Sequence, residues 1–125
     1  MTKQFNRIKG KEGEDKAVEL LKQKNYQIID QNNSTKWGEL DIIASKNDIL
    51  IFVEVKLKTT EDYGTPEEMI GKNKLAQVKR TAEMYLLNNP DIVKSFERYQ
   101  IDAICIVDPP NGEAGRMNHY ENVSF

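Results

Sequence analysis

Three residues have types and spacing that could carry metal-dependent chemistry. Asp41 lies in an apolar segment at residues 38–44, and Glu54 and Lys56 end the apolar segment at residues 49–56. Burying an unpaired carboxylate is costly, so Glu54 needs a partner. That partner is either Lys56, which points to the same face of a strand, or a divalent cation. Carboxylate oxygens suit Mg²⁺ or Mn²⁺, and such ions promote phosphodiester hydrolysis.

The two apolar segments predict a β-hairpin that brings the acids together. Residues 38–44 and 49–56 are typical of strands, and the polar residues 45–48 between them are typical of a turn. A turn centred on residues 46–47 predicts these pairs: Ala44 with Ile49, Asp41 with Phe52, and Glu39 with Glu54. Four side chains then share one face of the sheet: Glu39, Asp41, Glu54 and Lys56. Glu39 could be either a further ligand or a structural acid.

A helix predicted at residues 11–24 adds a further acid. Ala17, Val18 and Leu21 form its apolar stripe, and Glu14 lies at the edge of that stripe rather than on the polar face. Gly13, like Gly10, precedes Glu14 and permits a close approach to the sheet. Glu14 either joins the metal cluster from above the sheet or is an acid favoured by the helix dipole.

The remaining elements favour one α/β domain over residues 1–125. Strands are expected at residues 26–30, 101–107 and 119–123, and the apolar run at 49–53 predicts a central strand covered on both faces. Asn25 is the expected stop of the first helix. Thr65, Pro66 and Glu68 form a capping-box pattern that starts a second helix, which is expected to end before Asn89. Residues 91–97 are expected to add a helical turn.

Composition and charge limit the function classes. The 125 residues carry a formal net charge of −2, include one cysteine and contain no apolar run long enough to cross a membrane. No signal peptide is expected either, and the single cysteine fits a cytoplasmic protein. Lysine and arginine nevertheless gather at residues 3–24 and 72–80, where they form either solvated helix faces or a rim that contacts phosphates.

Other reactive or aromatic side chains give weaker evidence about the function. His119 is the only histidine and Cys105 lies in an expected core strand, so neither a zinc site nor a Cys–His nucleophile is predicted. Trp37 precedes the strand with the acids and is expected to be a packed rim aromatic rather than a base-stacking one. Tyr63, in a polar loop, would contact nucleic acid or close the site.

Several segments resemble the YraN-like family, a bacterial group within the restriction-endonuclease-like PD-(D/E)xK superfamily that is similar to archaeal Holliday-junction resolvases. The resemblance covers nearly the whole chain, and its strongest segments are Gly13-Glu14, Gly38 to Ala44, and Phe52 to Lys56. It implies a restriction-endonuclease-like core with a mixed central sheet flanked by helices. It also implies an active-site set, which comprises Glu14, Asp41, Glu54 and Lys56.

The resemblance also implies where DNA would bind. Lys74 would face DNA or support the site, and the nearby Lys72 would contribute to the same basic group. Lys58 stands where the family usually has arginine, which keeps the charge but loses the bidentate fork. Gln100 also replaces an arginine, so a phosphate contact there is in doubt.

The expected function is therefore a Mg²⁺- or Mn²⁺-dependent endonuclease acting on DNA, with branched or single-strand-containing DNA as the expected partner. Similar resolvases act as homodimers, although no dimer seam is visible in the sequence. One alternative is a nucleic-acid-binding module with the same fold that does not cut. The other is a protein-interaction domain whose lysine-rich faces are merely solvated. The intact set of acids favours the enzyme.

Overall fold

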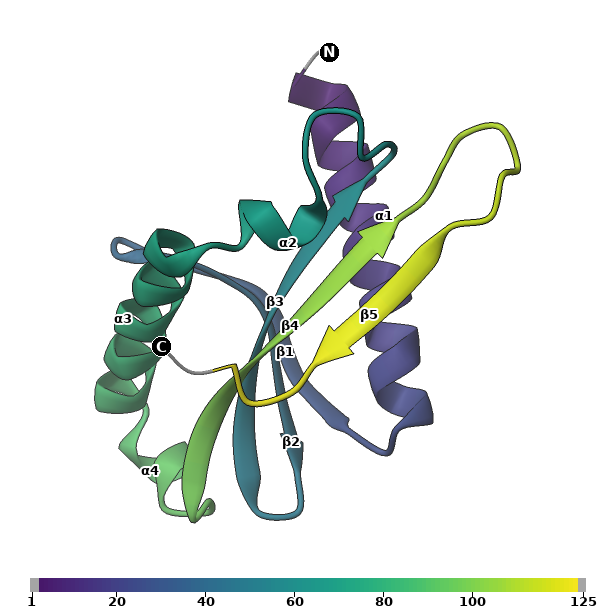
Figure 1. Cartoon of the computed structure of the whole chain (residues 1–125). Coiled ribbons are helices and arrows are strands. Elements are labelled where there is room, and N and C mark those ends of the chain that lie inside the picture. The colour runs from purple at the N-terminus through teal and green to yellow at the C-terminus, as the bar shows by residue number, and fades with distance from the viewer. Residues whose placement is uncertain (1–2, 124–125) are drawn as a thin grey trace.

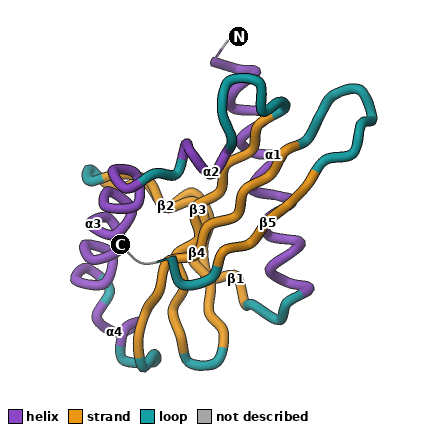
Figure 2. Tube along the Cα trace, in the orientation of Figure 1, coloured by secondary structure: helices purple, strands orange, loops and turns teal. Residues whose placement is uncertain are grey.

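The computed structural model describes residues 3–123 and, within them, the side chains of residues 9–123. Helices lie on both sides of a five-stranded sheet (Figures 1 and 2). The elements are, in order, α1 (Lys3–Gln23), β1 (Gln27–Thr35), β2 (Gly38–Lys46), β3 (Ile49–Lys58), α2 (Pro66–Met69), α3 (Lys72–Asn88), α4 (Pro90–Val93), β4 (Arg98–Val107) and β5 (Arg116–Tyr120).

The first helix is longer than predicted. It begins at Lys3 rather than Lys11, because Gly10 is a tolerated interruption that costs only about 1 kcal/mol in a helix. The predicted stop at Asn25 is confirmed, since this residue has a positive φ of 68° and the Tyr26 N–H donates to the Leu21 carbonyl at 2.9 Å. No helix within residues 3–123 combines the length and apolar character needed to cross a membrane.

The β2–β3 hairpin forms, but its predicted register is wrong by two residues. Asn47 and Asp48 both have positive φ, so they make a tight two-residue turn that pairs Lys46 with Ile49. Ala44 therefore pairs with Ile51 instead of Ile49, and the paired ladder ends at Ile42 and Val53. A shift of two residues keeps the side chains of the paired residues, 42–46 and 49–53, on their expected faces. It also means that Asp41 does not lie opposite Phe52.

The capping box is confirmed, but the helix that it starts is short. Thr65 caps α2, its hydroxyl accepts from the Glu68 N–H at 3.1 Å, and Pro66 occupies the first turn. The single helix predicted up to Asn89 is instead divided into α2 and α3. Gly71 has extended backbone and begins α3 anew, as expected for a residue with a low helix propensity. The helical turn expected within residues 91–97 is α4, which begins at Pro90.

The sheet has the order β1-β2-β3-β4-β5 and is mixed, with β3 and β4 parallel and the other neighbours antiparallel. The prediction that β3 is central is confirmed. The other strands occur where expected but with different ends, as β1 and β4 are longer and the last strand ends at Tyr120 rather than Val123. This mixed α/β arrangement confirms the predicted fold class and is compatible with a restriction-endonuclease-like core.

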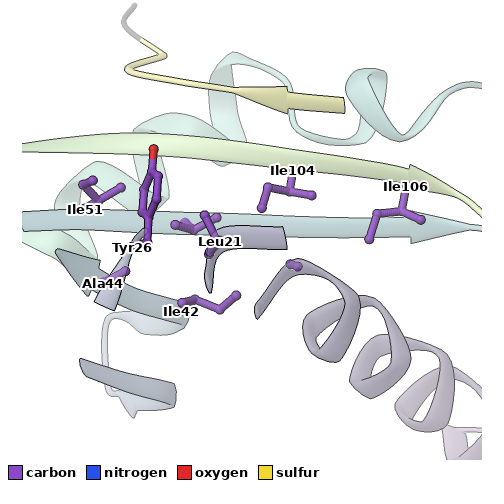
Figure 3. Packing of buried hydrophobic residues seen from close by; sticks show 9 residues of the cluster. Leu21, Tyr26, Ile42, Ala44, Ile51, Ile104 and Ile106 are labelled. Atoms are coloured by element: carbon purple, nitrogen blue, oxygen red, sulfur yellow. The ribbon is translucent and has the colours of Figure 1, made fainter. Parts of the chain in front are cut away.

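Two apolar layers hold the helices against the sheet. On one face Leu21 of α1 packs with Ile42, Ile51 and Ile104 of three strands (Figure 3). On the other face, α3 contributes buried residues that pack against Phe52 and its neighbours. Burial of this apolar surface is the main stabilising contribution to such a fold, and it fixes α1 and α3 relative to the strands that carry the acids.

Gly38 has a backbone conformation and close neighbours that favour glycine at this position. Its φ is +148°, and a Cβ added there would lie 2.8 Å from the Thr81 hydroxyl oxygen of α3. We expect Gly38→Ala to lower the free energy of unfolding by about 1–3 kcal/mol through backbone strain and this clash. Urea denaturation followed by circular dichroism measures the effect. Gly112→Ala, which also has positive φ but no atom within 4 Å, is the control for backbone strain alone; equal losses in both would contradict the role of the clash.

Candidate functional site

Gly13 brings α1 close enough to the sheet to deliver an acid. It is buried, and a Cβ added to it would lie only 3.0 Å from Cβ of Leu57 on β3. The close approach predicted from the sequence is therefore confirmed at Gly13. Gly10, one turn earlier, has no atom within 4 Å of an added Cβ. The next residue after Gly13, Glu14, consequently lies beside the strands at the end where β2 begins.

Three carboxylates meet at this point. Glu14 of α1 and both Glu39 and Asp41 of β2 place oxygen atoms within 4.8 Å of one another. Asp41 is fixed against β3, because its Oδ2 accepts a hydrogen bond from the Val55 N–H at 2.9 Å. The structure thus gives Glu39, whose role the sequence left open, a place in the acidic cluster.

A break in strand alternation near Asp41 explains this grouping. Leu40 and Ile43 pack in the same cluster on the α3 side of the sheet, whereas Ile42 packs on the α1 side. Strict alternation would put residues that are three positions apart on opposite faces. The irregularity lies around Asp41, beyond the last residue pair between β2 and β3. It allows Glu39 and Asp41 to reach Glu14.

Glu54 lies beside the cluster, where its side chain hydrogen-bonds to Asp41 and also approaches Lys74. Its side chain is almost completely buried, and its Oε1 lies 3.5 Å from the Lys74 ammonium of α3. Burial and then the neighbouring Asp41 carboxylate raise the pKa of Glu54 to about 8, although Lys74 opposes them. The predicted pairing of Glu54 with Glu39 is wrong, because the register differs and the ladder ends before either residue.

The electrostatics of the cluster favour the uptake of positive charge. Burial, the Asp41 carboxylate and the Glu39 carboxylate together raise the pKa of Glu14 to about 7. Burial also raises the pKa of Asp41 above its ordinary value, although the Val55 N–H opposes it. Near neutral pH the site thus holds protons that a cation could replace. Clustered carboxylate oxygens are the ligands that Mg²⁺ and Mn²⁺ prefer.

The raised pKa of Glu14 predicts a pH-dependent stability of the metal-free protein. A carboxyl group whose pKa rises from 4.5 to about 7 on folding contributes stability below pH 4.5, and this contribution is lost as the pH rises through 7. We expect Glu14→Gln to remove this part of the pH dependence of stability and to raise the melting temperature in EDTA at pH 8. Melting curves from pH 4 to 9 measure it, with the exposed Glu113→Gln as control. Parallel curves for wild type and Glu14→Gln would contradict the assignment.

Lys56 borders the cluster across a cleft of about 380 Å³. The cleft is lined by Lys9, Gly10, Glu14, Asp41, Val55, Lys56 and Leu57. Among the residues with described side chains, Lys56 makes no hydrogen bond or ion pair, so its ammonium is available to a ligand in the cleft. Of the four expected catalytic residues, Glu14, Asp41 and Lys56 thus line one cleft, and Glu54 is buried beside it.

The three lysines expected to contact DNA have different surroundings. Lys74 forms the ion pair with Glu54, while its side chain remains 42% exposed. Lys72 is exposed at the first position of α3. Lys58 donates to the Gly64 carbonyl at 2.8 Å and so holds the loop that follows β3. Lys72 and Lys74 can therefore face a ligand, whereas Lys58 has a structural contact.

Asp102 anchors a second polar network, which the sequence did not reveal. The buried Asp102 carboxylate accepts hydrogen bonds at 2.8 to 3.0 Å from Tyr26, Gln100, His119 and the Asn122 N–H. The other ring nitrogen of His119 lies 2.8 Å from the Lys24 ammonium. An ammonium can only donate, so Nδ1 accepts and Nε2 carries the hydrogen that Asp102 receives. Burial acts to raise the pKa of Asp102, but these hydrogen bonds leave it below its ordinary value.

Comparison with known proteins places the chain in a family. Residues 13–106 match the family described as "Uncharacterised protein family UPF0102". A UPF0102 protein from Alkaliphilus oremlandii is 44% identical over 119 residues, which cover 94% of this chain and 98% of that protein. A UPF0102 protein from Persephonella marina is 45% identical over 100 residues, covering 80% and 85% of the two chains. The chain therefore belongs to the UPF0102 family.

Proposed function

We propose that this protein is a Mg²⁺- or Mn²⁺-dependent endonuclease that hydrolyses phosphodiester bonds in DNA. The observation that carries the proposal is the meeting of Glu14, Glu39 and Asp41 within 4.8 Å, next to a cleft that also exposes Lys56. The resemblance to the YraN-like family and the PD-(D/E)xK superfamily supports the same reaction. Branched or single-strand-containing DNA is the substrate class that this resemblance favours.

The acidic cluster would hold the ion. Glu14, Glu39 and Asp41 would supply carboxylate ligands, and Glu54 is close enough to Asp41 to influence its charge. When bound, the ion would polarise the scissile phosphate and help to ionise the attacking water. The Val55 N–H keeps the Asp41 carboxylate in position, and the backbone of β3 thereby aligns one ligand with Lys56, one residue further on.

Lysine side chains would contact the phosphates of the DNA. Lys56, which has no other partner among the residues with described side chains, would stabilise the negative charge that develops on the phosphate and position the water. A lysine beside carboxylates is a poor general base, because the acids favour its charged form. Lys72 and Lys74, in the first turn of α3, would contact flanking phosphates.

Cleavage assays test the proposal directly. Purified protein is incubated with linear duplex, single-stranded DNA and a four-way junction in Mg²⁺, Mn²⁺ or EDTA. We expect cleavage in either metal, most on the substrates with unpaired or branched regions, and none in EDTA. Calorimetric titration with Mn²⁺ measures metal binding separately. Absence of cleavage on every substrate would reject the enzyme.

One observation favours a second function. Lys74 lies 3.5 Å from Glu54, one of the four residues expected to serve the reaction, so Glu54 has a partner other than a metal ion. The alternative is a nucleic-acid-binding module with the same fold that does not cut. Salt-dependent DNA binding together with no heat of Mn²⁺ binding would support this alternative over the nuclease.

A further inference from the structure

Trp37 is a large aromatic side chain that the fold leaves exposed. It lies in the two-residue turn between β1 and β2, and 46% of its surface is accessible. It belongs to none of the apolar clusters of the described residues. More than half of its surface is nevertheless covered, so both packing at the rim and stacking on a base stay predictions. A half-exposed indole is available for stacking on a ligand.

The backbone that carries this indole is firmly held. The Trp37 N–H donates to the Thr35 hydroxyl at 3.0 Å, and the Trp37 carbonyl lies 3.3 Å from the hydroxyl of the buried Thr81, which it shares with the Gln77 carbonyl at 2.9 Å. Figure 1 shows the β1–β2 turn reaching α3, which carries Thr81. A rigid backbone lowers the entropy that an aromatic residue loses on binding.

The charge around Trp37 suits a nucleic acid. The Lys36 ammonium lies 4.9 Å from the centre of the indole ring. Proteins that bind single strands combine cations along the backbone with aromatic side chains on which bases stack. Lys36 can move from the ring to a phosphate when a base takes its place, because its side chain is exposed and flexible.

The position of Trp37 relates it to the proposed site. It precedes Glu39 by two residues and Asp41 by four in the same strand region. At about 3.3 Å per residue, the backbone at Trp37 is at most about 13 Å from Asp41. A few nucleotides of one DNA strand are long enough to span this distance. One strand could therefore contact both Trp37 and the acidic cluster.

We propose that Trp37 stacks on an unpaired base, so that the protein binds single-stranded DNA segments in preference to intact duplex. Inside a duplex both faces of a base are covered by its neighbours, so an indole on a short turn can stack only where a base is unpaired. This inference rests on the proposed function and deepens it, because it names the feature of DNA that the site selects.

Trp37 also makes the experiment direct, because it is the only tryptophan in the chain. Wild-type protein in EDTA is titrated with a labelled dT₁₂ strand or a labelled 12-base-pair duplex. Tryptophan fluorescence reports stacking, and the anisotropy of the labelled DNA reports binding. We expect dT₁₂ to quench the tryptophan and the duplex to bind more weakly without quenching.

Trp37→Ala should weaken dT₁₂ binding roughly 5- to 150-fold, the range for one stacked base. Trp37→Phe should retain most of the affinity.

The matched control is Leu87→Ala, which removes another exposed apolar side chain from α3 and should leave dT₁₂ affinity unchanged. Binding of dT₁₂ without quenching, equal quenching by the duplex, or no binding at all would overturn the inference. The same measurements distinguish this inference from the proposed function. Quenching by dT₁₂ without cleavage in Mn²⁺ would support the stacking site and reject the nuclease. Cleavage that Trp37→Ala does not change would support the nuclease and reject the stacking site.

Discussion

Asp41→Asn is expected to lower the rate of metal-dependent DNA cleavage by about a thousandfold. Two unit charges 4 Å apart interact by about 4 kcal/mol at an effective dielectric constant of 20, and a loss of that size corresponds to about 10³ in rate. Asp41 is the acid that connects the cluster to β3 through the Val55 N–H. An asparagine oxygen can still accept that hydrogen bond, so the fold should persist.

Stability distinguishes this result from simple unfolding. Removing one of several repelling carboxylates should maintain or raise the melting temperature of Asp41→Asn in EDTA, while Mn²⁺ no longer raises it. The control is Asp91→Asn, because the Asp91 side chain is 98% exposed and its loss should change neither cleavage nor melting. Single-turnover cleavage on the best substrate measures the rate. Undiminished cleavage by Asp41→Asn would reject the proposed metal site.

Asp102→Ala is expected to lower the free energy of unfolding by about 4 kcal/mol, within the range for breaking a buried hydrogen-bonded network. The change removes, in a completely buried position, the acceptor for the Gln100 amide, the His119 ring and the Asn122 N–H, while the Tyr26 hydroxyl keeps Glu121 as an acceptor at 2.9 Å. Each donor left without a partner carries its own desolvation cost. Domains of this size have roughly 5–15 kcal/mol in total, so the variant should stay folded at 25 °C but with a clearly lower urea midpoint.

Urea denaturation at 25 °C measures this loss, and His119→Ala tests the network separately. It deletes one donor but leaves Asp102 with three others, so we expect a smaller loss of about 1–2 kcal/mol. Asp91→Ala is again the exposed control. If Asp102→Ala cost no more than this control, the hydrogen bonds of Asp102 would have no stabilising role.

Local patterns made much of the fold predictable. The capping box at Thr65, the stop at Asn25 and the central apolar strand each depend on neighbouring residues, and the structure contains all three. The close approach of α1 at Gly13 was also predictable, because a glycine next to an apolar stripe leaves room for a strand to pack directly against the helix backbone. These features are short-range, so one sequence was sufficient to find them.

The errors arose where the residue types permit more than one backbone conformation, or where distant residues decide the outcome. The hairpin register depended on whether Asn47 and Asp48 both take positive φ, which their types permit but do not require. The ion pair between Glu54 and Lys74 joins residues from a strand and a helix, and no periodic pattern indicates it. Asp102 was visible as a polar residue in an apolar strand, but its partners at Tyr26 and His119 were not.

The Asp102 network has a consequence for the order in which the chain folds. Lys24 and His119 are 95 residues apart, and contacts between such distant residues form late because closing the intervening loop costs entropy. During synthesis the helix α1 and the strands β1 to β4 exist before His119 has been added. Until then the Asp102 carboxylate lacks two of its four final partners, His119 and Asn122. Two of the four hydrogen bonds of Asp102 therefore cannot form until β5 and the residues that follow it have been synthesised.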